Sequence, residues 1–322
     1  MYGENKHFVC VRCADDDAWR LERTHSIGGS DAAAILGISK WSSPTSVWLE
    51  KTGQANVTDS KTPSAIMEFG NMMEPIVAEA FKARHPELKV QRANCICRSI
   101  ERPHCHASLD YEIRDDAGEW GVLEIKTATS EDDWADGVPE YYMCQVQHYL
   151  YVTGRAFAWV SVFFRMSCEM RDFFVARDDA AIDRIESACD DFWENVVSKT
   201  PPKLVSGTPD ESGAMVRAWK SNAGNVVRED PELANMVRTY EALAAQDKAI
   251  KHQKRLVTDA ICAKIGNAES VTMPSEKKRV RWVRQERTYF DSDGLKRDHP
   301  DLYDDYTTTR TTSGGLRITT TK

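Results

Sequence analysis

Two acidic residues and a lysine on neighbouring segments offer the chemistry of metal-assisted phosphodiester hydrolysis. Glu124 and Lys126 are two residues apart, so on a β-strand their side chains project from one face. Asp110 lies on the preceding segment, and across a hairpin its carboxylate can reach the same point. Carboxylate oxygens bind Mg²⁺, and an adjacent lysine can orient or deprotonate the attacking water. The pattern also fits a solvated hairpin face with a cross-strand ion pair, which contributes little energy.

Residues 104–128 are predicted to form the hairpin that brings these side chains together. The sequence Asp-Asp-Ala-Gly at residues 115–118 is a cluster of turn-forming residues, and apolar residues alternate on both sides of it. In the second strand we expect Val122 and Ile125 to point inward.

A glycine-rich segment upstream is a candidate anion site. We expect Ser30 or Asp31 to cap a short helix. Gly28 and Gly29 precede it, and backbone N–H groups at a helix start attract anions. Arg23 is close enough in sequence to join them. The alternative is a plain capped helix with an exposed arginine.

A helix over residues 65–84 carries a third acidic candidate. Pro75 either marks a first turn beginning near Glu74 or kinks a longer helix. If Glu74 faces the hairpin it adds a carboxylate to the site; otherwise it is surface charge.

A helix over residues 140–153, ended by Gly154, supplies polar residues near the motif. Gln145 and Tyr149 are four residues apart and share a helix face, whereas Gln147 points elsewhere.

The remaining elements predict an α/β fold with a mixed central sheet flanked by helices. Strands are expected at 88–92, 94–100, 157–164 and 169–175, with helices at 44–51 and 178–197. The first domain is predicted to span residues 1–200.

The C-terminal third is predicted to be a linker and a mostly helical extension. Residues 201–229 form the linker, and residues 230–322 the extension. The segment Asp230-Pro231 starts a long helix that ends at Gly266. Asp247 and Lys254 interrupt its apolar stripe, so we expect a packing helix rather than a coiled coil. A basic strand over residues 277–287 and a threonine-rich tail follow, and their role is not indicated.

Composition excludes several classes of protein. The chain has 322 residues, 41% hydrophobic and 29% charged, with a formal net charge of −8. That charge disfavours a generic polyanion binder but allows a local basic channel. No apolar run approaches the ~20 residues needed to span a bilayer. The first residues lack a signal-peptide pattern, so we expect a cytoplasmic protein without membrane association.

The nine cysteines are odd in number and scattered along the chain. We therefore expect reduced thiols rather than a disulfide framework. Cys10 and Cys13 have metal-ligand spacing, but no second tight pair accompanies them, so ordinary thiols are the preferred interpretation.

The separate features occur in the order of one family. The chain resembles the phage lambda exonuclease and YqaJ-type viral recombinase nucleases of the PD-(D/E)XK superfamily. The matching blocks lie within residues 15–155 and are Asp17-Ala18-Trp19 with Arg23 and Ser30, Phe69-Gly70 with Glu74, Ala107-Ser108-Leu109-Asp110, Leu123-Glu124-Ile125-Lys126, and Tyr142-Met143-Cys144-Gln145-Val146-Gln147. Blocks in order are far more specific than any one of them. Leu109 departs from the proline common before the aspartate, and that position supplies no ligand.

The resemblance also implies residue roles. The metal ligands for Mg²⁺ or Mn²⁺, two ions in all, would be Asp110, Glu124, the Ile125 carbonyl and Glu74. Lys126 would position or activate water, and Gln145 with Tyr149 would hold the lysine and the nucleotide, as in RecB-type nucleases. The terminal 5′ phosphate would be bound by Arg23, Ser30 and Ser108, with Gly29 in the adjoining helix start.

The implied activity is 5′-to-3′ exonuclease digestion of linear double-stranded DNA. It would leave 3′ single-stranded overhangs for a single-strand-annealing protein in phage recombination, in a bacterial host. Several family members form ring-shaped trimers, so a homo-oligomer is implied. Two alternatives stay open. A RecB-like nuclease with another role would need cysteines clustered after the motifs if it carried an iron–sulfur centre. A catalytically silent phage DNA-binding protein should have lost Asp110, Glu124 or Lys126.

Overall fold

The computed structural model describes residues 6–54, 65–203, 229–281, 288, 290–307 and 318. The chain divides into two compact units, residues 1–220 and 221–322. Most of the predicted linker, the second half of the predicted basic strand and most of the threonine-rich tail lie outside the described residues. The predicted domain limits therefore stay predictions.

The first unit alternates strands and helices. Its strands are β1 (Phe8–Val11), β2 (Lys89–Arg92), β3 (Ile96–Ser99), β4 (His106–Ser108), β5 (Tyr111–Arg114), β6 (Trp120–Ala128), β7 (Phe157–Phe164) and β8 (Glu169–Ala176). Its helices are α1 (Asp16–Thr24), α2 (Gly29–Ile35), α3 (Pro44–Lys51), α4 (Ala65–Arg84), α5 (Glu140–Thr153) and α6 (Asp179–Ser198), with a 3₁₀ turn η2 (Asp132–Trp134). The strands and helices predicted on both sides of the hairpin are confirmed, while β1 and α1 were not anticipated.

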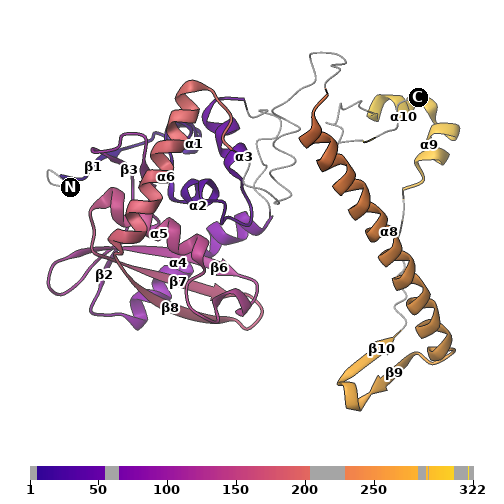
Figure 1. The fold of residues 1–322 in the computed structure, drawn as a ribbon. Helices are drawn as coiled ribbons and strands as arrows, with labels where there is room; N and C mark the ends of the chain where they lie inside the picture. Colours follow the sequence, from indigo (N-terminus) through magenta and orange to yellow (C-terminus); the bar gives the residue numbers. More distant parts are fainter. Residues whose placement is uncertain are drawn as a thin grey trace. The chain divides into compact units, whose positions relative to one another are not determined.

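A five-stranded mixed sheet in the order β2-β5-β6-β7-β8 forms the centre of this unit (Figure 1). Strands β6 and β7 run parallel, and the other neighbours run antiparallel. Helix α4 packs on one face, and α2, α5 and α6 contribute to the core on the other. The predicted α/β fold with a mixed sheet flanked by helices is confirmed.

Strand β6 is buried on both faces. Val122 belongs to the core on the α5 side, whereas Leu123 and Ile125 belong to the core on the α4 side. Val122 and Ile125 are both buried, which confirms the expectation that they point inward, but they face opposite sides of the sheet because they are three residues apart on the strand. Apolar residues on both faces are typical of a central strand.

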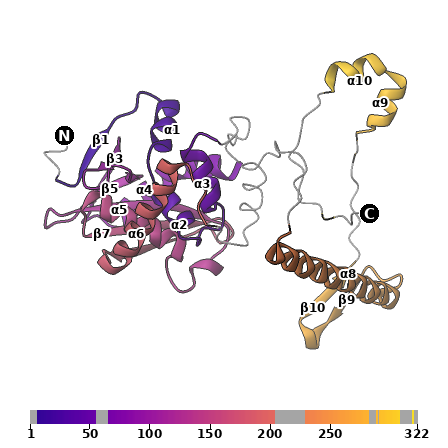
Figure 2. The same cartoon turned by 45° about the horizontal axis from the view of Figure 1, so that its top comes forward.

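The predicted hairpin is broken in its first strand. β4 pairs with β3 in a small three-stranded sheet, β1-β3-β4, whereas β5 pairs with β6 in the large sheet. Leu109 and Asp110 form the step between the two sheets. Strands β1 and β3 lie side by side near the N-terminus in both views (Figures 1 and 2).

Cys10 and Cys95 form a disulfide, so the expectation that all thiols are reduced is wrong for this pair. Cys10 lies on β1 and Cys95 just precedes β3, and pairing of these strands brings together residues 85 positions apart in sequence. The other seven cysteines are free.

The second unit contains α8 (Pro231–Ile265), β9 (Ser270–Met273), the 3₁₀ turn η3 (Pro274–Glu276), β10 (Lys278–Arg281), α9 (Ser292–Asp298) and α10 (Pro300–Tyr306). The side chain of Asp230 accepts hydrogen bonds from the N–H groups of Glu232 and Leu233, which confirms the predicted helix start. No residue of α8 is buried among the described residues, and the expectation that it is a packing helix stays a prediction. Within the described part of the chain, no helix is both long and apolar enough to cross a membrane.

Candidate active site

Strand β6 and the step before β5 bring the three predicted side chains together. The Lys126 Nζ donates a hydrogen bond to Glu124 Oε1 at 2.6 Å. Asp110 Oδ2 accepts a hydrogen bond from the Ile125 N–H at 2.9 Å. Asp110 stands one residue before Tyr111, which pairs with Leu123, so the aspartate lies beside Glu124. The predicted convergence of two carboxylates and an ammonium is therefore present.

Helix α5 contributes the amide side chain of Gln145, which bonds to two members of this group. The Gln145 Nε2 donates to Glu124 Oε1 at 2.8 Å, and its Oε1 accepts from Lys126 Nζ at 3.1 Å. The same Nε2 donates to the Tyr149 hydroxyl at 2.9 Å, as the shared helix face predicts. Gln147 instead bonds the Ala176 carbonyl and the Asp178 N–H, so it ties α5 to the loop before α6.

The start of α2 approaches α5 closely. A Cβ added to Gly29 would lie 2.7 Å from Tyr149 Cε1 and 2.8 Å from Gln145 Cγ. The predicted cap at Ser30 or Asp31 is wrong, because Gly28 is the N-cap and its N–H donates to Asp31 Oδ2 at 2.9 Å. Gly29 is thus a close-packing residue against Gln145 and Tyr149.

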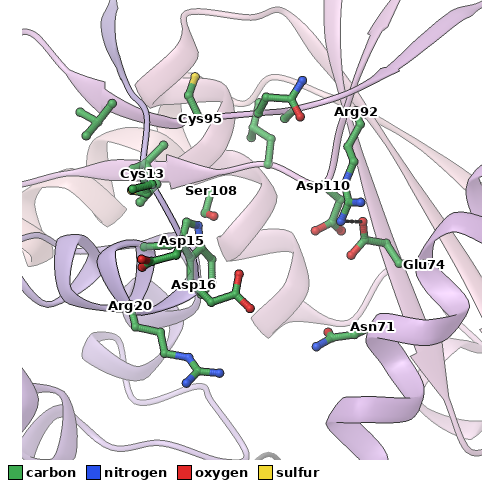
Figure 3. A pocket seen from close by; sticks show the side chains of 17 residues that line it. Cys13, Asp15, Asp16, Arg20, Asn71, Glu74, Arg92, Cys95, Ser108 and Asp110 are labelled. Carbon is green, nitrogen blue, oxygen red and sulfur yellow. Dashed lines mark ion pairs between the residues drawn. The ribbon is translucent and has the colours of Figure 1, made fainter.

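Helix α4 adds Glu74 from the opposite side. Glu74 Oε1 lies 3.4 Å from a guanidinium nitrogen of Arg92, the last residue of β2. The helix continues through Pro75, which has no N–H to offer the Asn71 carbonyl one turn earlier. Of the two alternatives that the sequence left open for Glu74, the structure shows the one in which it faces the acidic group: Figure 3 shows Glu74 and Asp110 facing each other beside Arg92.

A cleft of about 580 Å³ opens in front of Asp110 and Glu74. Its polar lining comes from the start of α1, from α4, from the β2–β3 connection and from β4 (Figure 3): Asp15, Asp16, Arg20, Asn71, Glu74, Arg92, Asn94, Ser108 and Asp110. Of the predicted phosphate-binding residues, Ser108 lines this cleft. Arg23 and Ser30 are not among the described residues that line it.

Arg23 and Ser30 lie on different helices, α1 and α2. Arg23 on α1 stacks on Trp19, with Cζ 4.4 Å from the ring centroid. Trp19 itself lines the cleft. Ser30 is exposed on the first turn of α2.

The carboxylates of this group are buried close to one another. Burial and the neighbouring charge of Asp110 raise the pKa of Glu124 to about 8. The same two causes raise the pKa of Glu74, and burial raises that of Asp110. Burial would lower the pKa of Lys126, but Glu124 and Asp110 outweigh it and raise it. The carboxylates repel one another and favour an added positive charge.

The residues present fit a hard divalent cation. Glu124 Oε2 is buried and has no hydrogen-bond partner, so its lone pairs are unsatisfied. No cluster of three or more histidine, cysteine, aspartate or glutamate side chains within the described ranges forms a preformed metal cage. Mg²⁺ is usually bound through one or two carboxylates and keeps several waters, so the pair Asp110 and Glu124 suits it.

Sequence reasoning missed two residues of the site. The Lys126 ammonium lies 4.6 Å from the centroid of the Tyr142 ring. Tyr142 is three residues before Gln145 on α5, and that spacing could have identified it. Arg92 carried no such signal, because its position depends on the pairing of β2 with β5.

The mixed sheet, with an acidic pair and a lysine at its central strands, defines a PD-(D/E)XK-type α/β domain. The family model described as the YqaJ-like viral recombinase domain matches residues 18–156. The chain is 32% identical over 305 residues to the uncharacterized protein YqaJ of Bacillus subtilis (strain 168), and the match covers 89% of each chain. The chain belongs to the YqaJ-like viral recombinase family.

Two solved structures are similar to part of this chain. The alkaline exonuclease LHK-Exo from Laribacter hongkongensis is 20% identical, and the match covers 57% of this chain and 94% of that chain with a TM-score of 0.48. A phage related exonuclease from Haemophilus somnus 129PT is 12% identical, and the match covers 54% and 96% with a TM-score of 0.38.

Proposed function

We propose that this chain is a Mg²⁺-dependent exonuclease that degrades the 5′-ended strand of linear double-stranded DNA. The product would be a 3′ overhang for a single-strand-annealing protein in phage recombination. The observation that carries the proposal is the junction of Asp110, Glu124 and Lys126, with one oxygen of Glu124 left unpaired. Membership of a viral recombinase family supports it.

Asp110, Glu124 and the Ile125 carbonyl would hold a Mg²⁺ or Mn²⁺ ion, and Glu74 would support a second. Such an ion polarises the scissile phosphate and neutralises charge on the leaving oxygen. Arg92 pairs with Glu74, so it balances the acidic side of the cleft before an ion binds.

Lys126 acts as a positive hydrogen-bond donor. Glu124 and Asp110 keep its ammonium protonated, so its Nζ–H groups can orient a water or a phosphate oxygen. Gln145 fixes the lysine and Glu124 together, and Tyr149 fixes Gln145. Preorganised donors of this kind need no rearrangement when charge develops.

Selection of a 5′ end would come from Arg23, Ser30 and Ser108. Ser108 lines the cleft, two residues before Asp110. Arg23 lies near the start of α2 and near Tyr149, since its positive charge acts to lower the pKa of Asp31 and of Tyr149. A guanidinium with hydroxyl donors recognises a terminal phosphate.

The first prediction tests the whole assignment. Lys126→Ala should abolish Mg²⁺-dependent digestion of a linear 5′-phosphorylated duplex, because the donor beside the nucleophile is lost. Duplexes labelled at the 5′ or the 3′ end, with circular DNA beside them, report polarity and end dependence. Lys82→Ala removes a surface lysine that pairs with Glu79 on the same helix; it is the matched control and should keep parental rates. Digestion by Lys126→Ala at the parental rate would rule out the proposed role.

A further inference from the structure

Helix α8 carries an apolar stripe, interrupted by a few charged residues, that no described residue of its own unit buries. Residues repeat at alternating spacings of three and four along it: Leu233, Met236, Tyr240, Leu243, Asp247, Ile250, Lys254, Val257, Ile261 and Lys264. The seven apolar members are each between 42% and 59% exposed. The helix has 35 residues, about 52 Å in length.

That spacing is the a/d repeat of a coiled coil. It is sustained over more than four heptads, and apolar residues at a and d bury themselves only against another helix. A stripe of this length, exposed on a soluble chain, marks an interaction surface. The question is which partner covers it.

We propose that α8 pairs with α8 of a second copy of this chain, in antiparallel orientation. Two charged residues within the stripe favour this orientation. Asp247 and Lys254 occupy a positions one heptad apart near the middle of the helix. In a parallel pair Asp247 would face Asp247 of the other copy and Lys254 would face Lys254, so like charges would meet at two positions. In an antiparallel pair Asp247 of each copy lies within a turn of Lys254 of the other, and opposite charges meet twice.

The charge of the rest of the helix agrees. Residues 231–247 hold one basic and three acidic residues, whereas residues 248–265 hold five basic and one acidic. Antiparallel pairing sets the acidic half beside the basic half at both ends. An interface in which each copy offers the same surface to the other is the usual form of a two-fold dimer.

Duplex DNA is the competing occupant, because residues 248–281 hold nine basic and three acidic residues. DNA would not bury Leu233, Met236, Tyr240 and Leu243, which lie on the acidic half. The apolar stripe therefore favours a helix over a polyanion.

Charge reversal in the full chain tests the proposal. Asp247→Lys and Lys254→Asp should each weaken self-association on the order of tenfold or more, because each replaces attraction by repulsion at both sites. The double variant, Asp247→Lys with Lys254→Asp, should restore it. Lys248→Asp, a reversal one position off the stripe, should have a smaller effect. Molar mass by light scattering and sedimentation velocity, over about 1 to 100 μM, give the association constants.

Circular dichroism of each variant checks that the helix is kept. Association unchanged in both single variants would overturn the proposal, since a parallel pair or another surface would give that result. A parent that stays monomeric at the highest concentration would overturn it too. So would variants that lose affinity for a 30-base-pair duplex while their molar mass is unchanged.

Discussion

At the scale of single residues, the amide of Gln145 joins the acid, the lysine and the tyrosine of the site. Its NH₂ group donates to the Glu124 carboxylate and its oxygen accepts from the Lys126 ammonium, so each end of the amide bonds to the charge that suits it. Glu124 and Lys126 were predictable because a spacing of two on a strand fixes one face. The unpaired oxygen of Glu124 was not predictable, because it depends on how α5 covers the strand.

Gln145→Ala should lower the digestion rate by about 10- to 100-fold, the usual loss when a group that orients metal ligands is removed. Initial rates at saturating Mg²⁺ measure this. Gln147→Ala is the matched variant on the same helix: it should lower the melting temperature, because Gln147 holds backbone groups, with a smaller change in rate. Equal rate losses in the two variants would contradict the assignment.

Arg23→Ala should reduce the preference for 5′-phosphorylated over 5′-hydroxyl ends, because a positive charge assigned to the proposed phosphate site is lost. The ratio of the two rates is the measurement. Arg20→Ala is the control, since Arg20 lies on the same helix and lines the cleft itself. A ratio equal to the parental one in Arg23→Ala would remove this residue from the phosphate site.

At the scale of elements, helices α2 and α5 pack closely because Gly29 has no side chain. Gly29→Ala would place a Cβ within 2.9 Å of the Gln145 carbonyl oxygen, which is backbone and cannot rotate away. We expect a loss of about 1 to 3 kcal/mol in unfolding free energy and a fall in rate, because α5 carries Gln145. Urea denaturation and initial rates are the measurements. Ser30→Ala, the exposed next position, should leave stability near the parental value.

The contact of α4 with β8 predicts an acid-sensitive part of the stability. Burial alone would raise the pKa of Asp172, but hydrogen bonds from Arg84 and Ser161 hold it below its ordinary value. A carboxyl with a depressed folded pKa stabilises the protein above its unfolded pKa, and the contribution is lost as pH falls through the folded value. Asp172→Asn should therefore melt below the parent at pH 6, and the difference should shrink toward pH 3. A constant difference would contradict this.

Most helices and strands could be predicted from local sequence signals, but the pairing of the strands could not. The bounds of α3 and α5 were predictable from Pro44, Gly53 and Gly154, since proline and glycine punctuate helices. The break of the first hairpin strand at Leu109 was not, because no proline or glycine marks it. The chain changes sheets there, and only the pairing of β4 with β3 shows it.

At the scale of the whole molecule, charge is unevenly distributed along a chain of net charge −8. The cleft carries acidic residues beside Arg20 and Arg92, and α8 is acidic in its first half and basic in its second. Composition alone described an ordinary acidic protein. The distribution of charge, which steers ligands and partners, becomes visible only by position.

The pairing of β1 with β3 has a consequence for how the polypeptide is made. Phe8 leaves the ribosome early, yet its partner in the register is Ser99. At translation rates of about 5–20 residues per second, the nascent N-terminal segment waits roughly 5 to 20 seconds for that partner. Phe8 is almost fully buried in the finished protein, so during synthesis an apolar strand edge is open to chaperones and to neighbouring nascent chains.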